Sequence, residues 1–566
     1  MYNGFTNPLI VTDGNCEMIA EVEREAKNLF DQPIAALPYS QFKLFATTGS
    51  RVEYEESYME HRKMLCASCA MVLLRKGDEW LDKLCDVIWA ICDEYTWALP
   101  AHIVRCKNCD ETVTNIDLFS SETAFALSEI HYLLRDKLPQ EVKARIEYEL
   151  GRRIITPYLE KKPKWGKNNW SAVCASGVGA TLIYLGLDEK FALAKDNLLL
   201  NLSDFLESFP DDGCCLEGCL YWFYGFSHFC YIAQLLYEYT DGKINYFADE
   251  KVEKIAFFCN NIYLADNFCI PFSDSPHTYN YNPGILHFLA EKYDGITIPP
   301  TQYAEKFENS ARYRFATFLR NLYWCKDLPK DKKMRNDVVV YPDSAWYINR
   351  KNSYIFAAKA GHNDEPHNHN DVGSFLVFDG GKYILDDVGW AKYDSKYFDP
   401  NERYKGTSCT TSLGHSLPIV DGCAQKFGKE YCGKIVSATD DRAAIEYSGA
   451  YGLDTLTKLE RCFVLQKDRV VITEKATGDF ENIVFRFTTR TNPFLCDNEV
   501  RIEDYILKCT EKADVSLSHF DFEPRFAGFG TEKAGYERVY LIDFDLNGKK
   551  QAEFILEKQD KNNFFL

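Results

Sequence analysis

Apolar residues recur every three to four positions through roughly the first 330 residues, the spacing of one face of a helix. Clear cases are the runs from Trp80 to Ile91, from Ser120 to Leu134 and from Phe226 to Leu236. The runs end in glycine, proline or polar clusters, which are typical helix stops. Many helices of similar length without a short solenoid repeat favour an α/α-toroid, an incomplete barrel of helical hairpins, over a small bundle.

The pattern changes near Val338, where short β-rich runs begin to alternate with turns. Examples are Tyr354 to Ala357, Ser374 to Phe378 and Val539 to Ile542, with turn signals such as Asp379-Gly380-Gly381 between runs. This alternation predicts antiparallel strands. The expected organisation is multidomain, α then β: a toroid over 1–335 and an antiparallel β-sandwich over 336–566, with the charged stretch 326–333 as linker.

Composition narrows the function classes. The 566 residues carry 65 basic and 84 acidic side chains, a net charge of −19, which argues against nucleic-acid and membrane-surface partners. The 21 cysteines are scattered, as expected of reduced thiols. No charged start followed by an apolar run is seen, so we expect a cytoplasmic protein, or a periplasmic or secreted one if a leader was trimmed. A homodimer stays open.

The densest chemistry lies at the start of the second half, where three of only 11 histidines, His362, His367 and His369, fall within eight residues. On a strand His367 and His369 would share a face, so both rings could point at one site. Asp386, Asp387 and His415 follow downstream. Imidazole nitrogen and carboxylate oxygen are good zinc ligands. The alternative is that these are ordinary surface or hydrogen-bonded histidines.

The run 367–375, the run 381–389 with its Asp387-Val388-Gly389, then Arg403, and finally the run 414–422 around His415 resemble the heparinase II/III-like polysaccharide lyases, a family that includes heparinases and oligoalginate lyases. The resemblance implies a structural zinc held by His369, Asp387 and His415, with Asp386 as the alternative to Asp387. It also implies that His367 faces the substrate.

The helical half contains two segments similar to this family. The stretch 167–174 implies that Asn169 binds a uronate carboxylate, with Asn168 beside it or bracing the backbone. The stretch 212–221 implies that Tyr221 is the catalytic tyrosine, with Tyr224 as its competitor. Further candidates for substrate binding are Glu217, Arg403, Trp97 and His102. Read without the family, Asn168-Asn169-Trp170 is a helix cap and a core indole, and Tyr221 belongs to an aromatic core run.

The resemblance therefore implies a lyase that cleaves uronic-acid-containing oligosaccharides or polysaccharides, of glycosaminoglycan or alginate type, by β-elimination. An acid or base comes from Tyr221, with Tyr393, or Tyr397 four residues on, as the second such group, while Asn169 and His367 neutralise the carboxylate. The missing export signal favours oligosaccharides over intact polymer. Basic residues near these motifs are candidates for a local positive cluster: Arg152, Arg153, Lys164, Lys167 and Arg403.

Three other functions remain open. A glycoside hydrolase could use Asp212 and Glu217 as paired carboxylates. A zinc-dependent hydrolase would leave an open position on the metal for water. A carbohydrate-binding protein would need no chemistry. The pairs Cys66/Cys69 and Cys106/Cys109 are too far apart for a zinc ribbon and are interpreted as free thiols.

Overall fold

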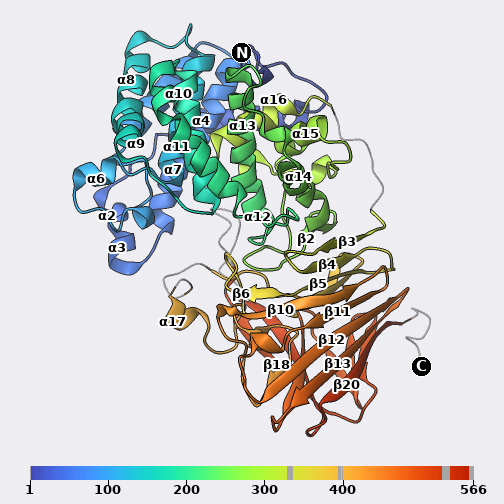
Figure 1. Ribbon diagram of the computed structural model, residues 1–566. Coiled ribbons are helices and arrows are strands. Elements are labelled where there is room, and N and C mark those ends of the chain that lie inside the picture. The colour runs from blue at the N-terminus through green and yellow to red at the C-terminus, as the bar shows by residue number, and fades with distance from the viewer. Residues whose placement is uncertain are drawn as a thin grey trace.

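The computed structural model describes residues 2–310, 312–327, 335–392, 397, 399–524 and 536–559, without the side chains of 400 and 401. A helical half leads into a β half (Figure 1). The helices are α1 (Cys16–Phe30), α2 (Tyr39–Phe42), α3 (Leu44–Thr48), α4 (Val52–Leu73), α5 (Glu79–Asp93), α6 (Cys109–Val113), α7 (Leu118–Leu133), α8 (Gln140–Leu150), α9 (Thr156–Lys161), α10 (Asn169–Tyr184), α11 (Asp188–Leu206), α12 (Cys219–Tyr221), α13 (Ser227–Tyr239), α14 (Glu250–Ile262), α15 (Pro283–Lys292), α16 (Phe315–Trp324) and α17 (Pro400–Arg403).

The long helices pack on one another around a shared apolar core. α10 is buried along nearly its whole length and lies against α7, α11 and α13. α16 returns to contact α4 and α7, so the end of the helical half meets its beginning. The predicted helical runs correspond to α5, α7 and α13. None of the described helices is both long enough and apolar enough to cross a bilayer.

A buried ion pair holds α16 to α7. Arg320 donates to both carboxylate oxygens of Glu129 at 3.0 Å, and Tyr184 donates to the same carboxylate at 2.6 Å. Both charged side chains are fully buried. Since a buried charge without its partner is strongly unfavourable, this pair fixes how the two helices meet.

The β half consists of antiparallel sheets. The strands are β3 (Val338–Tyr341), β4 (Trp346–Asn349), β5 (Ile355–Lys359), β6 (Gly361–Asn363), β7 (Phe375–Asp379), β8 (Lys382–Leu385), β9 (Ile419–Val420), β10 (Gly428–Ala438), β11 (Arg442–Glu446), β12 (Leu456–Gln466), β13 (Arg469–Gly478), β14 (Ile483–Thr489), β15 (Phe494–Cys496), β16 (Glu499–Ile502), β17 (Tyr505–Cys509), β18 (Asp514–Phe522), β19 (Glu537–Asp545) and β20 (Gln551–Lys558). A short hairpin, β1 (Tyr263–Ala265) and β2 (Phe268–Cys269), belongs to the helical half.

Among the described strands three larger sheets form. Their orders are β15-β16-β17-β20-β13-β12-β11-β10-β6, β18-β19-β14-β9 and β3-β4-β5-β7-β8. The last sheet lies between the helices and the rest of the β half (Figure 1). Its alternate residues enter two cores: Trp346 and Leu376 join the helical core, while Tyr347 and Phe375 join the sandwich core. This sheet is therefore the structural interface of the two halves.

The two halves change over where the sequence pattern predicts, since α16 ends at Trp324 and β3 begins at Val338. Most of the predicted linker, 328–333, lies outside the described residues. The predicted strand runs correspond to β5, β7 and β19. The expectation of helices followed by antiparallel strands is confirmed.

The buried pair yields a prediction about stability. Arg320→Met leaves the Glu129 carboxylate buried and uncompensated, so the free energy of unfolding of the helical half should fall by about 3–5 kcal/mol. Urea titration followed by far-ultraviolet circular dichroism measures it. The matched control is Lys326→Met: its partner Glu291 lies 3.5 Å away and both side chains are 61% exposed, so the change should stay within about 0.5 kcal/mol. Equal losses in the two variants would contradict the proposed role of the buried pair.

Candidate active site and metal cluster

His367 lies in a turn after β6 and has a left-handed backbone, with φ of 55°. The expectation that His367 and His369 share one face of a strand is therefore wrong, because the strand ends at Asn363. A non-glycine residue in this conformation is held there by its surroundings and is frequent at functional sites. Here the backbone N–H of Asp274 donates to the His367 carbonyl at 3.3 Å.

Asp274 is the fully buried carboxylate around which the site is arranged. His367 Nδ1 lies 2.9 Å from its Oδ2, and His369 Nε2 lies 3.1 Å from its Oδ1. The hydroxyl of Tyr397 donates to Oδ1, and Arg403 Nη2 lies 3.5 Å from it. Burial alone would raise the pKa of Asp274, but hydrogen bonds from the two histidines lower it well below its usual value. Asp274 belongs to the loop before α15, so the helical half orients two histidines of the β half.

Tyr221 stacks on His367, with ring centroids 4.4 Å apart and planes inclined by 27°. It ends the short helix α12, and a π-helical turn, Trp222–Phe226, follows at once. Such turns recur at functional sites. Gly225 lets this turn approach α10, because a Cβ there would lie 3.1 Å from Asn169 Cβ. The turn therefore brings Tyr221 toward the start of α10.

A small cavity joins the predicted groups of the helical half to the loop that carries His367. Asn169, Glu217, Tyr221 and Pro366 all line it. Asn169 is the first residue of α10, 9% exposed, and its side chain makes no hydrogen bond to any residue that the structure describes. Burial raises the pKa of Glu217, opposed by the positive field of His367. The predicted catalytic residues Asn169, Tyr221 and His367 thus lie together.

Other predicted residues have structural contacts. Asn168 caps α10 by accepting from Trp170 N at 2.9 Å and donates to Trp165 O at 3.1 Å, so it braces the backbone, the alternative that the sequence left open. Trp97 is 1% exposed and its indole N–H donates to Ile91 O, so its predicted contact with substrate is wrong: the ring has no accessible face.

His102 and Tyr224 also have specific partners. His102 Nδ1 lies 2.6 Å from Asp117 Oδ2, beside the carboxylate oxygen that caps α7. Tyr224 donates to Glu122 at 2.6 Å under the guanidinium of Arg314 and faces a different, larger cavity.

Arg403 and Tyr397 support the turn that carries the histidines. Arg403 donates to Asn368 O at 2.8 Å and lies over the Tyr397 ring at 4.2 Å. Burial, together with the Asp274 charge, raises the pKa of Tyr397, which disfavours it as a second proton-transfer group. Tyr393 lies outside the described residues.

The basic residues proposed as a positive cluster are mostly paired with acids. Arg152 and Arg153 bind Glu149, and Lys167 binds Glu207. For Lys164 the structure gives no ion pair among the described residues. Arg152 and Arg153 share the one carboxylate of Glu149, so part of their positive charge is left uncompensated, whereas the charge of Lys167 is balanced by Glu207.

The second feature is a buried cluster of His369, Asp371, Asp387 and His415, whose ligand-type atoms lie within 4.8 Å of one another. Asp386 lies outside it, paired with His277 at 2.9 Å and Arg490 at 3.0 Å, which favours Asp387 as the ligand. Asp371 was missed, although it continues the alternate spacing of His367 and His369.

The donor atoms of this cluster fit a metal. A carbonyl only accepts, so the contact of His415 Nε2 with Cys409 O at 2.7 Å leaves Nδ1 facing Asp387 Oδ2 at 3.1 Å. Two acceptors facing each other need a proton or a cation between them. Without a cation, burial would lower the pKa of His415, but the Asp387 charge outweighs it and raises the pKa to about 9.

Two buried atoms of the cluster that lack a hydrogen-bond partner also indicate a metal. His369 Nδ1 and Asp371 Oδ2 are buried without a hydrogen-bond partner in the described part of the chain. Two nitrogen and two oxygen donors are a ligand set that zinc accepts. All four residues have an exposed fraction of 0%, so the cluster offers no open position for water. This disfavours the zinc-dependent hydrolase.

Asp212 does not form the carboxylate pair that a hydrolase needs. It accepts from Asp343 N, Ser344 N, Ser344 Oγ and Cys214 N at 2.8–3.1 Å, tying the helical half to the turn before β4. Glu217 lines the small cavity, and Asp212 does not. The glycoside-hydrolase alternative therefore lacks one of the two catalytic carboxylates that it needs.

Comparison with known proteins bears on the fold. No family model matches the sequence, and no curated protein matches it. Solved structures do match. Heparan sulfate lyase HepC from Pedobacter heparinus is 15% identical with a TM-score of 0.60, covering 96% of this chain and 88% of that one.

Two further structures agree. Heparinase III is 12% identical with a TM-score of 0.63, covering 98% and 94%. The chondroitin AC lyase of Streptomyces coelicolor A3, in complex with chondroitin sulphate, is 11% identical with a TM-score of 0.53, covering 96% and 83%. At these identities the likeness shows the fold: an α/α-toroid followed by an antiparallel β-sandwich, the class that the sequence predicts.

A substitution at Asp212 tests its assignment as a structural group. Asp212→Ala removes the acceptor of four hydrogen bonds and should lower the free energy of unfolding by about 1–3 kcal/mol. Asp211→Ala is the matched control, because that side chain is 89% exposed and should change stability by about 0.5 kcal/mol or less. Thermal unfolding of both variants gives the comparison. An Asp212→Ala protein as stable as the control would contradict the assignment.

Proposed function

We propose that the protein is a lyase that cleaves uronic-acid-containing glycans by β-elimination and leaves an unsaturated uronate end. One observation carries the proposal: Tyr221 stacks on His367 and shares a cavity with Asn169, where the helical half meets the β half. Two solved structures of the same fold, a heparan sulfate lyase and a chondroitin AC lyase, support an acidic glycan as substrate.

In the proposed reaction a base takes the C5 proton and the electrons of the C5–H bond form the C4=C5 double bond. The C4–O4 bond breaks with its electron pair staying on O4, which takes up a proton. The carboxylate at C6 gains negative charge as the C5 proton leaves, and stabilising that charge is usually the largest contribution to such catalysis. The Asn169 amide can donate a hydrogen bond to it. Asp274 holds Nδ1 of His367, so Nε2 is the nitrogen that we propose faces the carboxylate.

Tyr221 is the proposed proton-transfer group. A phenol is protonated near neutral pH and can protonate O4 directly; it serves as base only where nearby positive charge lowers its pKa. Glu217 lies in the same cavity, and its burial raises its pKa.

We further propose that zinc is held by His369, Asp387 and His415, with Asp371 as a fourth ligand. Asp274 and the Cys409 carbonyl hold the outer nitrogens of the two histidines, an arrangement typical of metal-bound histidines. The bound ion would stabilise the loops of the β half structurally. The Asp274 carboxylate therefore orients both histidines: His369 of the metal cluster and His367 of the active site.

Removing one hydroxyl tests the proton transfer. Tyr221→Phe keeps the ring on His367, so stability should be nearly unchanged while turnover falls by about 10²–10⁴-fold. Ultraviolet absorbance of the unsaturated product, measured over a panel of uronic-acid oligosaccharides, reports turnover. Tyr224→Phe is the control and should lose less than about tenfold, because its hydroxyl is bound to Glu122. Near-normal turnover in Tyr221→Phe would refute its role, and glycan cleavage without unsaturation would refute the lyase.

Metal removal tests the zinc proposal. A chelator should lower the melting temperature of the wild-type protein, because metal binding contributes folding free energy. His369→Ala should contain no zinc, and the chelator should leave its melting temperature unchanged. Asp386→Asn, beside the proposed ligand but outside the cluster, should keep its zinc. Elemental analysis and thermal unfolding give both readouts. A His369→Ala protein that retains zinc, or a wild-type protein indifferent to chelation, would contradict the proposal.

A further inference from the structure

Each residue of the buried metal cluster has two atoms able to bind a metal, and the protein occupies one of the two. His369 Nε2 faces Asp274, and His415 Nε2 faces the carbonyl of Cys409. The two Nδ1 atoms are left: that of His369 has no hydrogen-bond partner in the described chain, and that of His415 faces Asp387. Each histidine therefore offers a single nitrogen to a bound ion.

The Asp387 carboxylate is divided in the same way. The backbone N–H of Gly389 donates to its Oδ1 at 3.3 Å. Its Oδ2 accepts from the Ser374 hydroxyl at 3.0 Å and faces His415. Because an oxygen that accepts from a neutral hydroxyl keeps a second lone pair, Oδ2 of Asp387 can also bind a cation.

Asp371 differs because the group on its Oδ1 is itself a cation. The ammonium of Lys359 donates to Oδ1 at 2.7 Å, whereas Oδ2 is buried with no hydrogen-bond partner among the described residues. The side chains of Lys359 and Asp371 are 2% and 1% exposed, so water cannot replace the ammonium. A metal ion on Oδ1 would lie beside this second positive charge and be repelled by it. Asp371 therefore offers only Oδ2.

The number of donor atoms decides which metal ions fit the cluster. Two nitrogens and two oxygens, one atom from each residue, make the four-coordinate set that zinc accepts. Magnesium, calcium and manganese prefer oxygen ligands and need more of them. A carboxylate that binds through both oxygens would supply a further oxygen, and Lys359 prevents this at Asp371.

We propose that Lys359 determines the metal specificity of the cluster: by holding Oδ1 of Asp371 it keeps the site four-coordinate and selects zinc over ions that need more oxygen ligands. The inference rests on the zinc site of the proposed function and names the residue that sets which ion binds there. Lys359 can also be changed by itself. Two of the other three contacts come from backbone atoms, and the third comes from Asp274, which also holds His367.

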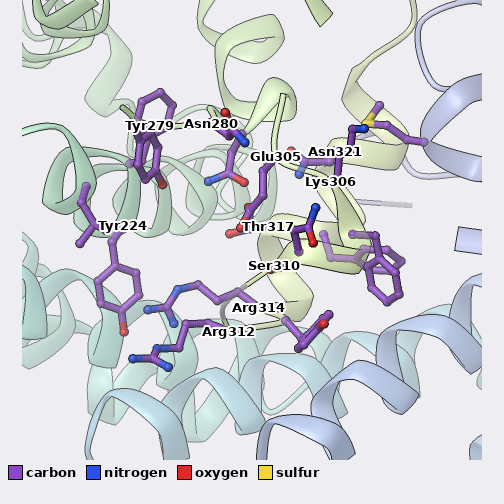
Figure 2. Close-up of a pocket in the computed structure, with 18 of the residues that line it drawn as sticks. Tyr224, Tyr279, Asn280, Glu305, Lys306, Ser310, Arg312, Arg314, Thr317 and Asn321 are labelled. Atoms are coloured by element: carbon purple, nitrogen blue, oxygen red, sulfur yellow. The ribbon is translucent and has the colours of Figure 1, made fainter. Parts of the chain in front are cut away.

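No second cluster in the described part of the chain competes for the ion. The metal cluster is the only group there in which three or more histidine, cysteine or acidic side chains bring their ligand atoms together. The larger cavity is lined by Glu21 and Glu305 and by three cations, Lys306, Arg312 and Arg314 (Figure 2). Because the cations outnumber the carboxylates, a divalent ion is disfavoured in that cavity.

Separate titrations with two ions test the inference without any substrate. The full-length wild type and Lys359→Met are stripped with a chelator, and Zn²⁺ and Mn²⁺ are each added back in chelator-buffered solutions while thermal unfolding reports binding. Sites with nitrogen donors prefer Zn²⁺ to Mn²⁺ in any case, so the readout is the change in this preference. Lys359→Met should lower the preference for Zn²⁺ at least tenfold, because the released Oδ1 of Asp371 adds an oxygen donor.

Two control variants accompany the titrations. Lys382→Met removes an ammonium that lies 2.7 Å from Glu503, the same distance as in the buried pair, but these two side chains are 56% and 34% exposed. It should keep the wild-type preference. His369→Ala should lose the binding of both ions, and any signal that persists in it comes from elsewhere in the chain and is subtracted.

Cobalt provides a readout that decides the matter even if Lys359→Met fails to fold. Four-coordinate Co²⁺ absorbs visible light more strongly than six-coordinate Co²⁺, so the wild type loaded with Co²⁺ should show the intense bands. Weak bands in the wild type, an unchanged preference in Lys359→Met, or an equal change in Lys382→Met overturns the role of Lys359 and leaves the zinc site standing. A wild type that binds none of these ions overturns the zinc site as well. None of these measurements depends on the lyase reaction, which the unsaturated product tests separately.

Discussion

One buried carboxylate, Asp274, constrains both halves of the site. It comes from the helical half, yet its two oxygens are used by His367 and His369 of the β half. A carboxylate buried this deeply is stable only if its partners stay in place, since losing one leaves an uncompensated charge. The same contact therefore fixes the ring that stacks on Tyr221 and the ring that belongs to the metal cluster.

The fold could be predicted because the period of the apolar residues changes once, between Trp324 and Val338. Within each half the pattern also locates elements, since β5, β7 and β19 lie on the runs that the sequence indicates. The sheet at the interface of the two halves was harder to predict from the sequence. Its central strands β4, β5 and β7 are buried on both faces, so runs such as 375–378 are apolar throughout and do not reveal which side meets the helices.

The site was predictable where its residues share a local motif. His369, Asp387 and His415 come together as expected, and Asp371 could have been added from its spacing. Asp274 could not, because it is an isolated acid between two serines and its histidine partners lie 93 and 95 positions away. The prediction that Trp97 contacts substrate was wrong for a different reason: residue type alone cannot distinguish an indole that stacks on a sugar from an indole of the core.

A net charge of −19 is unfavourable for attracting an acidic glycan, so long-range steering cannot account for the proposed substrate. The cations beside the site do not change this, because Arg403 faces Asp274 and Arg314 is neutralised by Glu122. What the site offers instead is short-range: the Asn169 amide and an imidazole held by a buried carboxylate. Hydrogen bonds in a water-poor cavity are stronger than in bulk water. Recognition of the uronate would then depend on removing its bound water inside the cavity. A binding group of the right shape removes that water, and a diffuse positive surface does not.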